Sequence, residues 1–232
     1  MKATINLVSF FFLFLLVACG GPEGKKVEAT DAKAVPAPTT TATTPTASAS
    51  TEIANYNLNK GTLNWTGSKL TGSSHSGTIS VVLGDIQAKG DNILSGQFVI
   101  DMKSITNTDL EAGKGKEKLE GHLKNADFFD VEAHPRATFL ITGSKPATGD
   151  ATHTVTGNLT IKGIAKSVDI PVNVAVVENK LTVVSSSFVI DRTQWGIKYG
   201  SSSIAGLAKD KIISNDIALV LNLEATANAP AQ

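Results

Sequence analysis

Apolar and polar residues alternate along most of the chain from about Ile53 to Thr226. Alternation with a period of two is typical of β-strands that bury one face and expose the other. The expected inward positions are Leu63 and Trp65; Ile79, Val81 and Leu83; Leu94, Phe98, Ile100 and Met102; Ala137, Phe139 and Ile141; Val155, Gly157, Leu159 and Ile161; Val168, Ile170, Val172, Val174 and Val176; and Ile217, Leu219, Leu221 and Leu223. The pattern predicts about eight antiparallel strands, many of them long.

Long strands with one solvent-exposed face favour a sheet that closes on itself, because closure removes the unpaired strand edges through which the protein would otherwise aggregate. The interior of a barrel of about eight strands is either filled by side chains or able to hold one small ligand. Residues 53–226 are more than a filled barrel needs, and the inward set is mostly Val, Ile and Leu. We therefore predict an all-β fold, an antiparallel eight-stranded barrel with a lumen.

One segment, Ser104 to Asp130, departs from the strand pattern. Leu119 and Leu123 are four residues apart among helix-forming residues, which predicts a short helix over Lys116 to Lys124 with its apolar edge on the barrel. Phe128 and Phe129 follow the helix, and we expect them at the mouth of the barrel. A second short helical turn is expected at Ile204 to Ala208, and residues 227–232 are expected to be a tail.

The N-terminus carries an export signal. Residues 1–18 contain one lysine and an apolar run that is too short to span a bilayer, as in a secretory signal peptide. Leu16 to Cys19 resembles the lipobox of bacterial lipoproteins, which implies cleavage before Cys19 and attachment of lipid to it. An ordinary secretory peptide with an incidental cysteine is the alternative. The residue after the cysteine is Gly20 and not an aspartate, which by the same resemblance favours the outer membrane. We therefore expect an envelope lipoprotein that faces the periplasm or the cell surface.

The segment from Cys19 to about residue 52 is rich in Ala, Thr and Pro. Such a composition lacks the apolar surface needed to offset the entropy of ordering, so we expect a disordered linker between the lipidated cysteine and the barrel.

Charge and reactive residues exclude several classes of function. The 21 basic and 21 acidic residues balance, which gives no electrostatic case for a nucleic-acid partner. The four histidines, His75, His122, His134 and His153, lack metal-ligand spacing, and the chain contains no P-loop, dinucleotide fingerprint or nucleophile elbow. We therefore predict no metal, no cofactor and no enzymatic activity.

Two segments with the same four letters, Phe98 to Asp101 and Phe188 to Asp191, place Phe and Ile on one strand face. We expect these faces to line the lumen, with other large apolar residues beside them or near the opening. The predicted ligand-binding residues are Trp65, Phe98, Ile100, Met102, Phe128, Phe129, Phe139, Ile141, Val184, Phe188, Ile190, Arg192 and Trp195. The alternative for the apolar members is a filled core. For Asp191 and Arg192 the alternatives are contact with a ligand's polar head, a rim salt bridge, or a turn cap.

Three motifs in chain order resemble those of the YceI-like family. They are His122 to Val131 followed by Pro135 to Phe139, Gly157 to Val168, and Asp191 to Ile197, and Gly67 to Lys69 with His75 to Gly77 suits the family's first hairpin. The resemblance covers about residues 54 to 225, with departures at Gly121 and Ala165. It implies an extended lipocalin-like barrel, exported in bacteria, that binds polyisoprenoid or similar long-chain amphiphiles in its lumen.

The sequence is compatible with three classes of function. The first is a lipid-anchored carrier or reservoir for an isoprenoid or fatty-acid-like ligand. The second is an envelope interaction protein with a filled barrel, and the third is an enzyme acting on such lipids. The sequence leaves a homodimer open. Contact with the membrane is expected through the N-terminal lipid alone.

Overall fold

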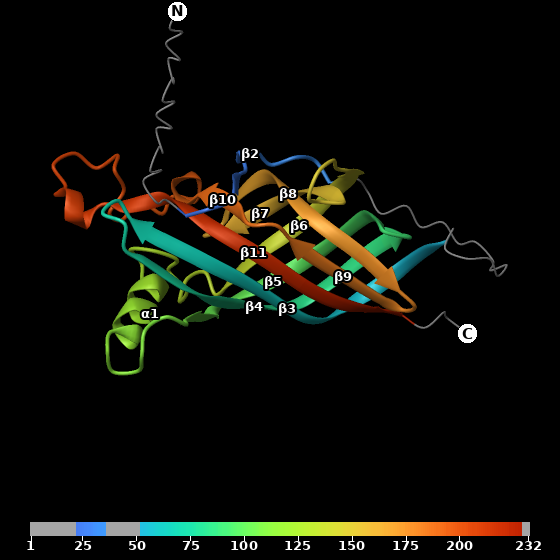
Figure 1. Ribbon diagram of the computed structural model, residues 1–232, viewed down its shortest axis with the longest axis horizontal. Coiled ribbons are helices and arrows are strands. Elements are labelled where there is room, and N and C mark those ends of the chain that lie inside the picture. The colour runs from blue at the N-terminus through green and yellow to red at the C-terminus, as the bar shows by residue number, and fades with distance from the viewer. Residues whose placement is uncertain (1–21, 36–51, 229–232) are drawn as a thin grey trace, which may run out of the picture.

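A barrel of eight antiparallel strands forms the body of the computed structural model, which describes residues 22–35 and 52–228 (Figure 1). Each strand pairs with the next along the chain, and β11 closes the barrel by pairing with both β9 and β3. The strands are β3 (Ile53–Lys69), β4 (Ser74–Lys89), β5 (Asn92–Asn107), β6 (Arg136–Pro146), β7 (His153–Ile161), β8 (Ile164–Val177), β9 (Lys180–Ser185) and β11 (Ile213–Ala227). The predicted fold class is confirmed.

A short strand, β10 (Phe188–Asp191), follows β9 and pairs with β11. Its other edge pairs in parallel with β1 (Lys25–Lys26), and β2 (Thr30–Asp31) pairs with β8 at Ser167 and Lys166. We call residues 22–35 the N-terminal strap. The strap covers the two edges that β10 and β8 expose where β9 no longer lies between them.

The strap differs from the expected disordered linker. Val27 is only 6% exposed, and its N–H donates to Val189 O at 2.9 Å. The Asn158 side chain accepts from Lys33 N and donates to Lys33 O. Unpaired strand edges and one apolar side chain thus order a segment whose composition indicates disorder. The signal peptide, Cys19 and the rest of the linker, residues 36–51, lie outside the described residues.

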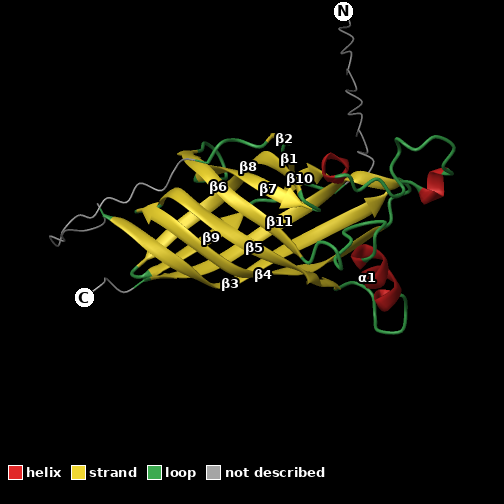
Figure 2. Cartoon of the chain, turned by 180° about the vertical axis from the view of Figure 1, so that it is seen from behind, coloured by secondary structure: helices red, strands yellow, loops and turns green. Residues whose placement is uncertain are grey.

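Helices gather at one end of the barrel (Figure 2). α1 (Lys116–Lys124) is the helix predicted from the Leu119 and Leu123 spacing, and its Glu120 carboxylate accepts hydrogen bonds from Asn107 N and Thr106 Oγ1, both at 2.8 Å. Two 3₁₀ turns follow later, η1 (Arg192–Trp195) and η2 (Lys209–Lys211), the second just after the turn expected at Ile204 to Ala208. Within the described ranges, no helix is both long and apolar enough to cross a membrane.

β-bulges shift the alternation within two strands. The pairing of β4 with β5 skips Val82, so Leu83 points outward and is 56% exposed, while Ile86 and Ala88 point inward. The prediction of an inward Leu83 is therefore wrong, because an extra residue in one strand reverses the faces beyond it. A second irregularity in the same ladder places Ile93, rather than Leu94, in the core.

Candidate functional site

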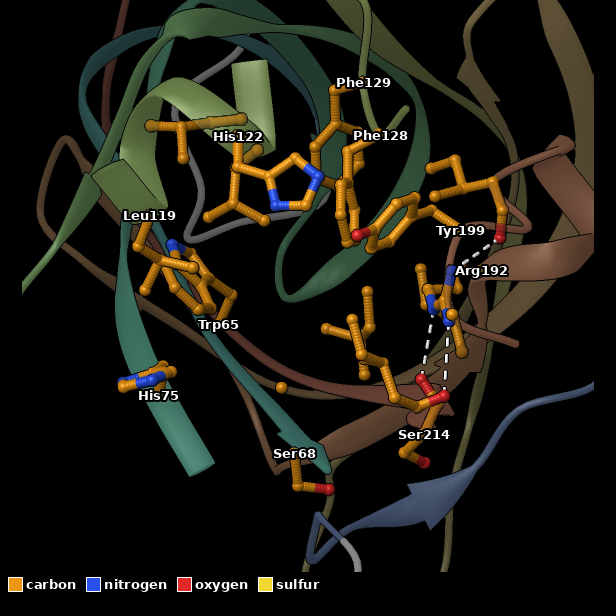
Figure 3. Close-up of a pocket in the computed structure, with 18 of the residues that line it drawn as sticks. Trp65, Ser68, His75, Leu119, His122, Phe128, Phe129, Arg192, Tyr199 and Ser214 are labelled. Carbon is orange, nitrogen blue, oxygen red and sulfur yellow. Dashed lines mark hydrogen bonds between the residues drawn. The ribbon is translucent and has the colours of Figure 1, made fainter. Parts of the chain in front are cut away.

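A cavity of about 640 Å³ occupies the end of the barrel nearest α1 (Figure 3). Its wall comes from the inward side chains of the strands, and its mouth from α1 and the loops beside it. The strand residues include Leu63, Trp65, Ile79, Ile100, Met102, Ile105, Ala137, Leu159, Ile161, Ile190, Ile217 and Leu219, and the mouth residues include Leu119, His122, Leu123, Phe128, Phe129, Tyr199, Ile204 and Leu207. The surface offered to a guest is mostly aliphatic and aromatic carbon.

The other end of the barrel is filled. A gap of only about 10 Å³ remains there, too small to hold a ligand. The side chains that close it are Ile86, Ile93, Phe98, Phe139, Ile141, Val155, Ile170, Val172, Val183, Leu221 and Leu223. The sequence left open whether the barrel interior is a lumen or a filled core. One half of the barrel has a lumen and the other half is filled.

Seven of the predicted ligand-binding residues meet in the cavity although they come from distant parts of the chain. They are Trp65, Ile100, Met102, Phe128, Phe129, Ile190 and Arg192. Their shared cavity supports the prediction that the Phe/Ile face of each repeated segment points inward, since Ile100 and Ile190, the isoleucines of the two segments, both line it.

The remaining predicted residues do not line this cavity. Phe98, Phe139 and Ile141 face inward but lie in the filled half. Phe188 is buried and lines neither space. Val184 is 36% exposed because Leu181 and Val183 take the inward face of β9. Trp195 is fully buried outside the cavity, where its Nε1 donates to Leu159 O at 3.0 Å.

The Phe128 turn is held by backbone hydrogen bonds. Asn125 O accepts from the N–H groups of Phe128 and Asp130, and Phe129 N–H donates to Leu123 O. Lys162, in the β7–β8 turn, donates its ammonium group to Ala126 O and Phe128 O. These bonds fix the backbone that presents Phe128 to the cavity, and those of Lys162 tie the first motif to the second.

An aromatic cluster forms one side of the mouth (Figure 3). The rings of His122 and Phe128 meet edge to face at 4.9 Å between centroids, and those of His122 and Tyr199 at 4.6 Å. Sequence reasoning did not assign His122 or Tyr199 to the site. Tyr199 lies in a loop without periodicity, whereas the four-residue spacing of Leu119 and Leu123 did indicate that α1 rests on the barrel.

Arg192 is the buried cation of the cavity wall. Its Nε donates to Ser214 O at 3.0 Å, Nη1 to Ile197 O at 2.8 Å and Nη2 to Ile213 O at 3.3 Å. Burial lowers the pKa of its guanidinium, opposed in part by the nearby charge of Asp191. The guanidinium has five N–H donors, so two remain beyond these three bonds.

Asp191 has a local role beside this cation. Its carboxylate accepts from Thr193 N and Thr193 Oγ1, at 2.9 and 2.7 Å, and so caps η1. Of the alternatives drawn from the sequence, the turn cap is the one that the structure shows for Asp191. Arg192 lies on the cavity and bonds to carbonyls.

Two further polar atoms on the cavity wall are buried without a hydrogen-bond partner among the described residues, Trp65 Nε1 and Ser68 Oγ. Buried polar groups normally have partners, so these two atoms are exceptions within the wall. Across residues 22–35 and 52–228, no group of three or more His, Cys, Asp or Glu side chains is arranged to hold a metal ion.

Comparison with known proteins places this geometry in a family. A family model described as a YceI-like domain matches residues 53–225. A UPF0312 protein of Pseudomonas putida (strain F1) is 32% identical over 106 residues, which are 46% of this chain and 52% of that protein. A UPF0312 protein of Azotobacter vinelandii is 49% identical over 47 residues, 20% of this chain and 24% of the relative. The matched part thus spans a quarter to about half of these relatives.

Two solved structures share the fold. Burkholderia cenocepacia BcnA superposes with a TM-score of 0.53 at 24% identity, over 72% of this chain and 96% of that one. A polyisoprenoid binding domain from Saccharophagus degradans, described as implicated in plant cell wall breakdown, gives a TM-score of 0.54 at 19% identity, over 76% of this chain and all of that one. At these identities the likeness shows the barrel fold.

Proposed function

Because this chain belongs to the YceI-like domain family, we propose that it binds a long-chain amphiphile, polyisoprenoid or fatty-acid-like, in the cavity beside α1. The observation that carries the proposal is the cavity itself, about 640 Å³ lined mainly by apolar side chains. A structural neighbour described as a polyisoprenoid binding domain supports it.

The binding energy comes from hydrocarbon that leaves water. Each buried methylene contributes about 0.8 kcal/mol, so about ten supply ~8 kcal/mol before the cost of immobilising the guest. A wall of Ile, Leu, Met and Phe imposes no requirement on the position of any one carbon. The cavity therefore favours binding and release over catalysis, and we propose a carrier or reservoir.

We propose that the polar head of the guest lies beside the wall groups whose hydrogen-bond donors have no partner in the described part of the chain. Arg192 offers two N–H groups, and Trp65 Nε1 and Ser68 Oγ lack partners among the described residues. A carboxylate, phosphate or carbonyl oxygen would satisfy these donors, and the hydrocarbon would run toward the filled half of the barrel. We propose this orientation for the guest.

We also propose that the protein works as a lipoprotein of the bacterial envelope, anchored through Cys19, most simply at the outer membrane. The support is the sequence from Leu16 to Cys19. Anchoring would keep the carrier beside the membranes that supply and accept its guest.

The direct test is to purify the full chain from a bacterial host without denaturation and to extract it with organic solvent. Native mass spectrometry should show added lipid mass, and the delipidated protein should take up a fluorescent fatty acid. Protein that carries no bound mass and takes up no fluorescent fatty acid would overturn the proposal.

A further inference from the structure

We propose that Phe98 and Phe139 form a floor across the middle of the barrel and thereby set the longest hydrocarbon chain that the cavity can bury. The inference rests on the proposed function, because it specifies the length of guest that the same cavity accepts. The floor makes affinity rise with chain length only up to a fixed limit.

The floor lies where the lining changes from open to filled. The cross-strand pair Ile100 and Ala137 lines the cavity, and the next inward pair along β5 and β6, Phe98 and Phe139, lines only the small gap beyond it. The same change occurs along β11, where Leu219 lines the cavity and Leu221 lines the gap. The change therefore occurs on β5 and β6, which are neighbours, and on β11, which β3 and β4 separate from β5, so it spans the barrel.

Both rings are seated by glycines on adjoining strands. A Cβ added at Gly84, the β4 partner of Phe98, would overlap the Phe98 ring. A Cβ added at Gly157 on β7 would overlap the ring of Phe139. Each ring thus occupies space that a neighbouring side chain would otherwise fill. Close packing on both sides leaves the rings little room to swing aside for a longer guest.

The volume gives the expected limit. With about 30 Å³ for a group the size of a water molecule, 640 Å³ holds roughly 20 non-hydrogen atoms. A saturated fatty acid of about 18 carbons has this size. Carbons beyond that number must stay at the mouth, in contact with water, and add no binding energy.

The test is a chain-length series on the delipidated full chain. Saturated fatty acids of about 8 to about 24 carbons compete with a fluorescent fatty acid, and each added pair of methylenes should strengthen binding by up to about fifteenfold. We expect the increase to stop near about 18 carbons in the unmodified protein.

We call the chain length beyond which affinity no longer increases the stopping point. Two variants should move it in opposite directions. Phe139→Ala lowers the floor and should move it to chains longer by roughly four to six carbons. Ala137→Leu adds carbon to the open side of the floor and should move it to chains shorter by roughly two to four carbons, without leaving a void. Phe188→Ala removes the same ring from a buried position that lines neither space, and should leave the stopping point unchanged.

The outcomes separate the two proposals. If no fatty acid of any length binds, the proposed function and the floor both fail. If affinity keeps rising through about 24 carbons, or if neither Phe139→Ala nor Ala137→Leu moves the stopping point, the floor is overturned while lipid binding stands. If the Phe139→Ala variant does not fold, the Ala137→Leu variant alone tests the floor.

Discussion

Arg192 joins two segments of the mouth, through the carbonyl of Ile197 after η1 and those of Ile213 and Ser214 at the start of β11. Its charge lies in an apolar wall, 5.8 Å from the centroid of the Phe128 ring. A cation in this setting costs desolvation energy that the carbonyl dipoles offset only in part. The residue thus stabilises the mouth and, under the proposed function, would favour a guest with an anionic head.

Replacing Arg192 by methionine separates these two effects. Since a hydrogen bond to a charged group contributes about 1.5–3 kcal/mol, Arg192→Met should lower the free energy of unfolding by roughly 3 kcal/mol or more, as measured by urea denaturation. The preference for a fatty acid over the fatty alcohol of equal length should fall about tenfold, equivalent to ~1.4 kcal/mol. An equal loss of affinity for both ligands would show that Arg192 acts only through the fold.

The two tryptophans should respond differently to the same change. Trp195 Nε1 donates to Leu159 O, whereas Trp65 Nε1 has no partner among the described residues. Trp195→Phe should therefore destabilise the delipidated protein by about 0.5–1.5 kcal/mol more than Trp65→Phe, because it removes a buried hydrogen bond that Trp65 does not make. Urea denaturation of both variants measures the difference, and equal losses would contradict it.

The period-two pattern predicts which face a side chain takes but carries no information on its level along the barrel. Phe98 and Ile100 share a face and are predicted to have one role, yet Ile100 lines the cavity whereas Phe98 lies in the filled half. Trp195 and Arg192 belong to one motif, but a 3₁₀ turn points them to different places. Site residues on loops, such as Tyr199, leave no periodic signal.

At the scale of elements, α1 is fixed to β5 by Glu120. The hydrogen bond from Asn107 N is the main reason that the pKa of the Glu120 carboxyl is lowered, with a further contribution from Thr106 and opposition from burial. A carboxyl whose pKa is lowered by folding stabilises the fold at pH values above its unfolded pKa. That stabilisation is lost as the pH falls through the folded pKa.

The attachment of α1 should therefore weaken on acidification below about pH 4, near the pKa of an unfolded Glu. Glu120→Gln should lower stability at neutral pH and reduce the loss of stability between neutral and acidic pH, as followed by denaturant unfolding. Glu117→Gln is the control, since the Glu117 carboxylate contacts Gly113 N in the loop before the helix. A Glu120→Gln protein with an unchanged pH profile would contradict this role.

The N-terminal strap was not predictable from the sequence. Its composition indicates disorder, and its two strands, of two residues each, are too short to show periodicity. Its one buried apolar side chain offers a test. Val27→Asp should lower the free energy of unfolding by about 2–3 kcal/mol and expose the edges of β8 and β10 to aggregation. Val35→Asp, at a position 47% exposed, should change stability by less than about 0.5 kcal/mol. Similar effects of the two changes would show that the strap does not pack on the barrel in solution.

At the scale of the whole molecule, strand number and closure were predictable from the sequence because they follow from alternation and the need to cover edges. The division of the lumen was not, since it depends on two bulky rings seated against glycines from other strands. The bulge that exposes Leu83 is likewise a property of pairing between strands.

The proposed anchor has a consequence for how the barrel meets the membrane. If Cys19 carries lipid, only five residues separate it from Lys25, where the strap joins β10. An extended residue spans at most about 3.6 Å, so the strap would lie within roughly 20 Å of the lipidated residue. Cys19→Ser should release the protein from the membrane fraction. A variant that remains with the membrane would contradict lipid anchoring at this residue.

The central claim is that the half of the barrel beside α1 holds an amphiphile. The measurement that tests it most directly is a crystal structure of the full chain, purified without removal of bound lipid. We predict one elongated electron density that runs from Arg192 and Trp65 to the rings of Phe98 and Phe139 and ends there. A protein that carries lipid by mass spectrometry but shows this density on its outer surface, or in the filled half, would contradict the claim.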